Sequence, residues 1–187
     1  MRLRVLIASA VLALSAAPAR AQGFISPFLG FTFGGDVAAT CASVTNCEDH
    51  RANWGVAFGT THGILGFEED IGYAKDFFGK TPTSDNAVLT VMSNLMVIIP
   101  AGPIRPYAIV GIGLMRPHIR FDASSLEFSK NSLGYDLGGG LSVFFTHGVG
   151  LRGDIRHLRT TDTFTFGLLN NEKLNFWRGS AAVVFRF

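Results

Sequence analysis

One segment of this chain brings together the residue types of an acyl-transfer site. His118 is followed at short spacing by Asp122, Ser124 and Ser125. A histidine that accepts the proton of a serine hydroxyl, with a carboxylate orienting the ring, converts the serine into a nucleophile. These residues carry no local sequence signature of a hydrolase. We therefore expect no catalytic site, and a lipid-modifying enzyme is kept as an alternative.

Two other chemical motifs are incomplete. Gly79-Lys80-Thr81 resembles the end of a phosphate-binding loop, but the earlier glycine of that motif would fall at Ala74. The five histidines show none of the tight spacings of metal ligands. The sequence thus predicts no metal, no nucleotide and no other cofactor.

The two cysteines, Cys41 and Cys47, flank a short polar segment. In an exported protein a disulfide is the expected state of such a pair. A metal site is the alternative, but His50 would supply only a third ligand. We predict a Cys41–Cys47 disulfide.

The N-terminus has the features of a secretory signal peptide. Arg2 and Arg4 precede an apolar run over residues 5–17, and residues 19–21 read Ala-Arg-Ala, a small-residue cleavage site. The apolar run is too short for a membrane-spanning helix, which needs about 20 residues. We expect residues 1–21 to be cleaved and residues 22–187 to form one domain.

Removal of this leader changes the charge of the protein. The chain has 16 Lys and Arg against 14 Asp and Glu, and three of the arginines lie in the leader, which leaves 13 against 14. This near-neutral balance gives no support for nucleic-acid binding.

The last eleven residues alternate in a way that suits a membrane-spanning strand. Trp177, Val183, Phe185 and Phe187 share one face of the expected strand, whereas Arg178 and Arg186 lie on the other. One face suits lipid and the other tolerates charge. We expect this segment to be the strand that closes a barrel by pairing with the first strand.

The same alternation recurs along the chain and predicts an all-β fold, an eight-stranded antiparallel up-and-down transmembrane β-barrel. The connections alternate between long and short, as in outer-membrane barrels. A soluble barrel with an apolar interior is the alternative. The expected strands cover residues 24–33, 53–61, 64–75, 87–99, 105–116, 132–145, 149–159 and 174–187.

Aromatic residues near strand ends are expected at the membrane interfaces: Phe24, Phe33, Trp54, Tyr73, Phe78, Trp177 and Phe187.

Several segments carry a family resemblance. Residues 66–73 (GFEEDIGY), 105–114 (RPYAIVGIGL), 137–141 (LGGGL), 151–156 (LRGDIR) and 184–187 (VFRF) resemble the bacterial outer-membrane β-barrel domain family, which includes OmpX-like proteins and the membrane domain of OmpA. The resemblance implies residence in the cell outer membrane, contact with its lipid and lipopolysaccharide, and a monomeric state. It also implies recognition of the C-terminal strand, with Phe185 and Phe187, by the barrel-assembly machinery.

Alternation also places a set of charged residues inside the barrel. Buried charges need partners, and the forked guanidinium of arginine suits carboxylates. We predict an interior network of charge pairs that fills the lumen, made of Glu68, Asp70, Arg105, Asp136, Arg152, Asp154, Arg156, Arg178 and Arg186. Glu69 shares the outward face with Phe67 and Ile71, and its orientation stays open.

The function expected from these features is structural or surface-interacting, such as envelope integrity, adhesion or resistance. A narrow channel for ions or small solutes is an alternative, because the same interior charges could line a path.

Overall fold

The computed structural model describes residues 22–35, 50–77, 84–121, 126–129, 131–161, 164–166, 169–172 and 174–187. Alternating apolar and small or polar residues extend these segments into long strands. The strands are β1 (Gln22–Phe33), β2 (His50–His62), β3 (Leu65–Lys75), β4 (Ser84–Ile98), β5 (Ile104–Phe121), β6 (Leu126–Ser129), β7 (Ser132–Phe144), β8 (Val149–Thr160), β9 (Phe164–Phe166), β10 (Leu169–Glu172) and β11 (Asn175–Arg186).

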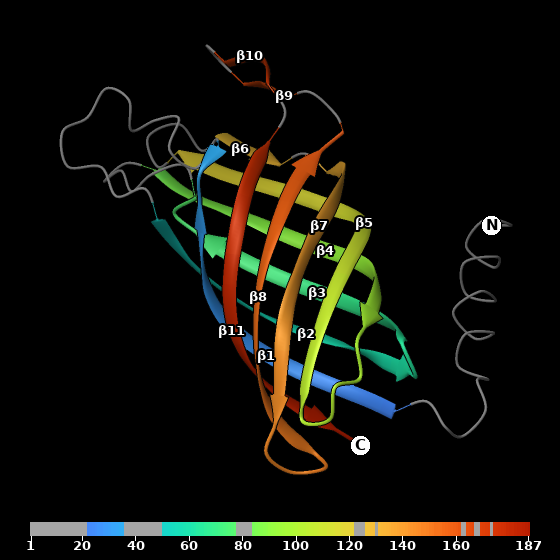
Figure 1. Ribbon diagram of the computed structural model, residues 1–187. Coiled ribbons are helices and arrows are strands. Elements are labelled where there is room, and N and C mark those ends of the chain that lie inside the picture. The colour runs from blue at the N-terminus through green and yellow to red at the C-terminus, as the bar shows by residue number, and fades with distance from the viewer. Residues whose placement is uncertain are drawn as a thin grey trace, which may run out of the picture.

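Eight of these strands close into a single antiparallel barrel (Figure 1). Their order around the barrel is β4-β3-β2-β1-β11-β8-β7-β5, and the pairing of β4 with β5 closes the ring. β6 pairs with the end of β5, and β9 and β10 form a separate hairpin. The predicted eight-stranded antiparallel barrel is therefore confirmed. Closure satisfies the backbone hydrogen bonds of every barrel strand without a free edge.

The last strand pairs with the first, as expected. Phe24 of β1 lies opposite Arg186 of β11, and Phe33 lies opposite Trp177. Gly23 and Phe187 exchange two backbone hydrogen bonds of 3.0 Å each, so the pairing continues to the end of the chain.

The two ends of the barrel differ in their connections. At one end, residues 63–64, 99–103 and 145–148 make short turns, and Gln22 and Phe187 lie at this same end. Gly63 and Gly102 have φ values of 61° and 69° in these turns, a left-handed conformation that glycine adopts without strain. We call this the short-turn end and the opposite one the long-loop end.

Several strands extend beyond the predicted limits at the long-loop end. β5 continues to Phe121 through the segment expected to be a loop from residue 117, and β2 begins at His50 instead of residue 53. Strand pairing needs only backbone hydrogen bonds, so a hairpin can continue into a polar segment where the apolar alternation has stopped.

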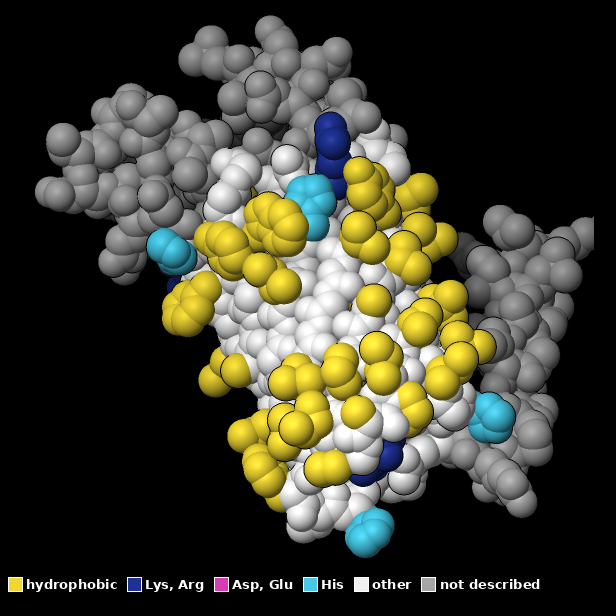
Figure 2. Space-filling view, in the orientation of Figure 1, with side chains coloured by type: hydrophobic (Ala, Val, Ile, Leu, Met, Phe, Trp, Pro, Cys, Tyr) yellow, Lys and Arg dark blue, Asp and Glu magenta, His cyan; other side chains and the backbone are white. Residues whose placement is uncertain are grey.

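Large hydrophobic side chains cover the outer surface of the barrel. Leu29, Ile112 and Leu137 are 71%, 66% and 59% exposed, and Figure 2 shows many such side chains spread over one face. A soluble protein exposes no apolar surface of this extent. No helix long and apolar enough to cross a membrane occurs among the described residues.

Most of the aromatic residues expected at the interfaces lie on the outer surface, but Phe24 does not. Trp54, Trp177 and Phe187 are exposed, and the rings of Trp54 and Tyr73 lie 5.6 Å apart. Phe24 points inward and is 5% exposed, because it belongs to the inward alternation of β1. Phe78 falls outside the described residues.

The lumen is packed in three layers. An apolar cluster lies near the long-loop end: Ala74, Phe77, Val88, Met92, Met115, Leu158, Leu174 and Phe176. A second lies near the short-turn end: Phe24, Met96, Ile98, Tyr107, Ile109 and Val184, with Phe144 against it. Charged residues occupy the height between the two clusters.

Candidate functional site

The central layer of the lumen is built by alternate residues of four strands. β8 places Arg152, Asp154 and Arg156 on its inward face, because residues two apart share a face of a strand. β3 contributes Glu68 and Asp70 in the same way, while β7 and β11 contribute Asp136 and Arg178. Three arginines and four carboxylates thus meet inside the barrel. We call these seven residues the lumen network.

Glu68 is fully buried and binds two arginines. Its Oε1 accepts hydrogen bonds from Arg156 Nη2 at 2.8 Å and Arg152 Nη2 at 3.2 Å, and its Oε2 accepts from Arg152 Nη1. One carboxylate from β3 therefore links two cationic side chains of β8 across the lumen.

Asp154 lies between the same two arginines on β8. Arg152 Nε donates to Asp154 Oδ2 at 3.0 Å, and Arg156 Nε donates to Oδ1 at 3.1 Å. The hydroxyls of Tyr107 and Ser180 each donate to this carboxylate at 2.9 Å. Asp154 therefore has a full set of donors.

Asp70 and Asp136 complete the network. Arg178 Nη2 lies 2.8 Å from both oxygens of Asp70, and Arg156 Nη1 lies 3.2 Å from Asp70 Oδ2 and 3.6 Å from Asp136 Oδ2. Asn94, with its amide oriented to satisfy both neighbours, donates to Asp136 Oδ1 at 2.7 Å and accepts from Arg156 Nη1 at 3.2 Å.

Glycines leave the room that these side chains occupy. A Cβ at Gly111 would collide with the side chains of Asn94 and Asp136. A Cβ at Gly72 would lie 2.6 Å from Arg178 Nη1 and 2.8 Å from Thr90 Oγ1. An eight-stranded barrel is just wide enough for its side chains to fill it, so long side chains on some strands require glycine on the facing ones.

The carboxylates and arginines of the lumen network are buried, so their stability depends on their pairing with one another. Every carboxylate of the network is at most 3% exposed at its side chain. Ions taken from water cost several kcal/mol each unless they are paired and hydrogen-bonded. Removal of one partner would therefore leave a costly unpaired charge in the lumen.

Two of the predicted network residues lie elsewhere. Arg105 and Arg186 point into the lumen at the short-turn end, where their guanidinium groups lie over the ring of Phe144 at 5.4 Å and 3.5 Å from its centroid. No described carboxylate forms an ion pair with either of them.

Tyr107 and Ser180 were missed by the sequence analysis. Tyr107 shares the inward face of β5 with Arg105, and its hydroxyl accepts from Arg152 Nε at 2.6 Å. Its place on that face was readable from alternation. Its contact with a residue of β8 depends on how far the strands are shifted along one another, which the alternation does not give.

Glu69 lies on the outer surface and is partly covered. Its two carboxylate oxygens accept hydrogen bonds from Ser93 Oγ at 2.8 and 2.9 Å. The neighbouring strand thus supplies a donor to an outward carboxylate, with no bulge that turns it inward.

The remaining predicted residues fall partly outside the described part of the chain. Cys41 and Cys47 lie there, so the disulfide stays a prediction. The same holds for Asp122, Ser124 and Ser125, whereas His118 lies in β5. Within the described segments no group of histidines, cysteines and carboxylates could hold a metal ion.

A closed eight-stranded barrel with an apolar exterior and a charged, packed interior defines the class of small membrane-spanning β-barrels. The family model for the outer membrane protein beta-barrel domain matches residues 6–187. The chain belongs to this family, and it is an outer-membrane β-barrel protein.

Solved structures share this fold at low sequence identity. Neisserial surface protein A is 15% identical, with a TM-score of 0.66 over 89% of this chain and 97% of its own. Ail of Yersinia pestis is 11% identical, with a TM-score of 0.54 over 89% and 99%. OprG of Pseudomonas aeruginosa is 12% identical, with a TM-score of 0.54 over 90% and 96%. Among curated proteins, no relative matches the chain.

Proposed function

We propose that this protein is a structural or surface-interacting component of the outer membrane whose lumen does not pass solutes. The observation that carries the proposal is the lumen network. Glu68, Arg156 and Asp136 are at most 1% exposed in the middle of the barrel, where a channel would hold water.

The apolar clusters support the same conclusion. Phe77 and Phe176 pack edge to face near the long-loop end, with ring centroids 4.9 Å apart and both side chains buried. An ion moving along the axis would have to cross this apolar layer and also displace charged groups that already bind one another.

The interacting surface in this proposal is the long-loop end, facing the outside of the cell. The short-turn end then faces the periplasm, as in barrels with short periplasmic turns and longer outer loops. We propose outer-membrane lipid and lipopolysaccharide as contacts of that end, where β5 carries Arg116 and His118. The role requires neither catalysis nor a cofactor.

Export and assembly follow the same proposal. A signal peptide over residues 1–21 would be removed, and a Cys41–Cys47 disulfide would restrain the first long connection. The outward Phe185 and Phe187 would present the C-terminal strand to the barrel-assembly machinery, after which the barrel would act as a monomer.

Ion conductance of the refolded protein in planar lipid bilayers tests the closed lumen. We expect no discrete current steps from the native chain. We expect none from the double variant E68A with R152A either, because the apolar clusters above and below the middle layer remain. Discrete steps from the native chain would refute the proposal and favour a narrow channel.

A lipid hydrolysis assay tests the enzyme alternative. We expect no release of fatty acid by the native protein in lipopolysaccharide-containing vesicles. Release that is lost in the H118A variant would overturn the assignment of a non-catalytic role.

A further inference from the structure

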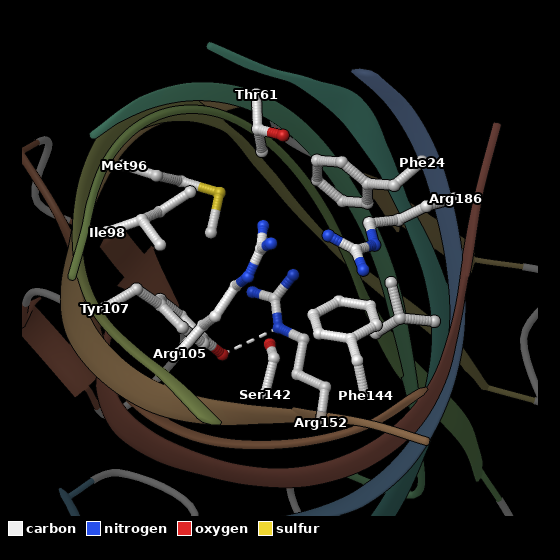
Figure 3. Close-up of a pocket in the computed structure, with 11 residues that line it drawn as sticks. Phe24, Thr61, Met96, Ile98, Arg105, Tyr107, Ser142, Phe144, Arg152 and Arg186 are labelled. Carbon is white, nitrogen blue, oxygen red and sulfur yellow. Dashed lines mark hydrogen bonds between the residues drawn. The ribbon is translucent and has the colours of Figure 1, made fainter. Parts of the chain in front are cut away.

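The short-turn end of the lumen contains a cavity of about 40 Å³ with three arginines in its wall. Figure 3 shows the guanidinium groups of Arg105, Arg152 and Arg186 converging toward the middle of the lumen. Thr61 and Ser142 add hydroxyl groups, and apolar side chains make up the rest of the lining. A water molecule needs roughly 10–15 Å³ of such space, so the cavity has room for about three waters or one small ion.

The three arginines differ in what they bind. Arg152 uses its guanidinium nitrogens on Glu68, Asp154 and the Tyr107 hydroxyl. Arg186 has one described polar contact, from Nη1 to Gln22 Oε1 at 3.2 Å, and the Nε groups of Arg105 and Arg186 are buried without a partner.

The charges of the lumen are therefore segregated along its axis. Each of the four carboxylates of the lumen network forms its ion pairs with Arg152, Arg156 or Arg178, and none of these pairs reaches Arg105 or Arg186. Arg105 and Arg186 form a second group that is cationic and stacked over one ring, Phe144.

Two like charges that share one aromatic ring repel each other, and the surrounding barrel wall reduces the screening by water. An anion between them would remove the repulsion and satisfy both free Nε groups. Guanidinium donors match the oxygens of carboxylate and phosphate better than they match a spherical ion.

We propose that the short-turn mouth of the barrel binds a small oxyanion, a phosphate or carboxylate group, between Arg105 and Arg186. The ligand is either a free anion that enters from the aqueous side or the headgroup phosphate of an anionic lipid at the rim. The site does not depend on whether the lumen conducts.

Titration of the refolded barrel with inorganic phosphate at constant ionic strength tests this site. The barrel is held in an uncharged detergent, and binding is followed by NMR of the arginine Nε–H signals. We expect the Arg105 and Arg186 signals to shift in a saturable manner. The same titration in nanodiscs of phosphatidylcholine with and without phosphatidylglycerol distinguishes the two sources of the oxyanion.

Variants connect the signal to the site. R105Q and R186Q should each weaken phosphate binding at least tenfold, and R186Q lies at a strand end where folding is least at risk. R159Q is the matched control, because it removes one positive charge from an exposed outward position near the other end of the barrel. Gel mobility before and after boiling verifies that each variant folds.

Saturable shifts from free phosphate that are lost in R105Q and R186Q but kept in R159Q would support a site for a free anion. Shifts that occur only with phosphatidylglycerol, and that are lost in R105Q and R186Q but kept in R159Q, would support a headgroup site. The proposal would be overturned by no saturable shift in either arm, or by an equal loss in R159Q.

Discussion

Replacement of Glu68 by glutamine should destabilise the barrel strongly, whereas the same replacement at the adjacent Glu69 should not. The two carboxylates are neighbours on β3 and point to opposite faces. Glu68 is buried against Arg152 and Arg156, and Glu69 lies on the outer surface against Ser93. The pair of variants therefore changes the same chemical group in two environments.

The magnitude follows from what remains after the change. Removing one partner of a buried ion pair typically costs about 3–5 kcal/mol. Arg152 and Arg156 each keep a contact with Asp154, at 3.0 and 3.1 Å. We therefore expect the lower end, about 3 kcal/mol, which corresponds to a change in the unfolding equilibrium on the order of a hundredfold.

Glu69 should behave differently because a charged group on the lipid face is unfavourable at mid-depth. Arg or Lys costs roughly 2–4 kcal/mol there, and a carboxylate costs less. Glutamine can keep a hydrogen bond with Ser93 and removes the charge. We expect E69Q to change stability by less than about 1 kcal/mol or to increase it.

Equilibrium unfolding of the refolded protein in lipid vesicles with urea gives both free energies. Gel mobility of the unboiled protein verifies that each variant reaches the folded state. An E68Q variant as stable as the native chain, or equal losses in E68Q and E69Q, would refute the assignment of Glu68 to a tightly paired interior.

Three further predictions concern packing and processing. G111A should destabilise the barrel or block folding, because the added Cβ collides with the side chains of Asn94 and Asp136. G153A on the lipid face should be tolerated, since a Cβ there would have Ser180 O as its nearest neighbour, at 3.9 Å. The temperature at which the compact gel band is lost compares the two variants. F176A should cost about 3–5 kcal/mol in urea unfolding through loss of a buried ring, against less than about 1 kcal/mol for F145A in an exposed turn. Mass spectrometry of the protein from outer membranes should find a chain that begins at Gln22, and an intact leader would contradict the cleavage site.

The fold was predictable because one physical rule governs most of the chain. A closed barrel in lipid must alternate outward apolar and inward small or polar residues, and Leu133, Tyr135 and Leu137 against Gly134, Asp136 and Gly138 already display this pattern. Alternation gave the inward face of the charged residues in the lumen for the same reason, whereas it left the orientation of Glu69 open.

The partner of each inward side chain was not predictable in the same way. Arg105 and Arg152 both point inward and lie opposite the same residue of β7, Ser142, yet only Arg152 reaches carboxylates of the lumen network. Alternation does not give this difference. Phe24 shows a second limit. An aromatic residue near a strand end suits an interface, but here the inward alternation of β1 places it in the lumen.

The lipid-facing assignment of the outer surface is tested most directly by fluorescence quenching of the two tryptophans. Trp54 and Trp177 both point outward near the long-loop end, and they are the only tryptophans of the chain. In vesicles of lipids brominated at different depths, bromines near the headgroup should quench both tryptophans more than bromines near the bilayer centre, with little quenching by aqueous iodide. Strong iodide quenching with no effect of the brominated lipids would contradict a membrane-embedded barrel.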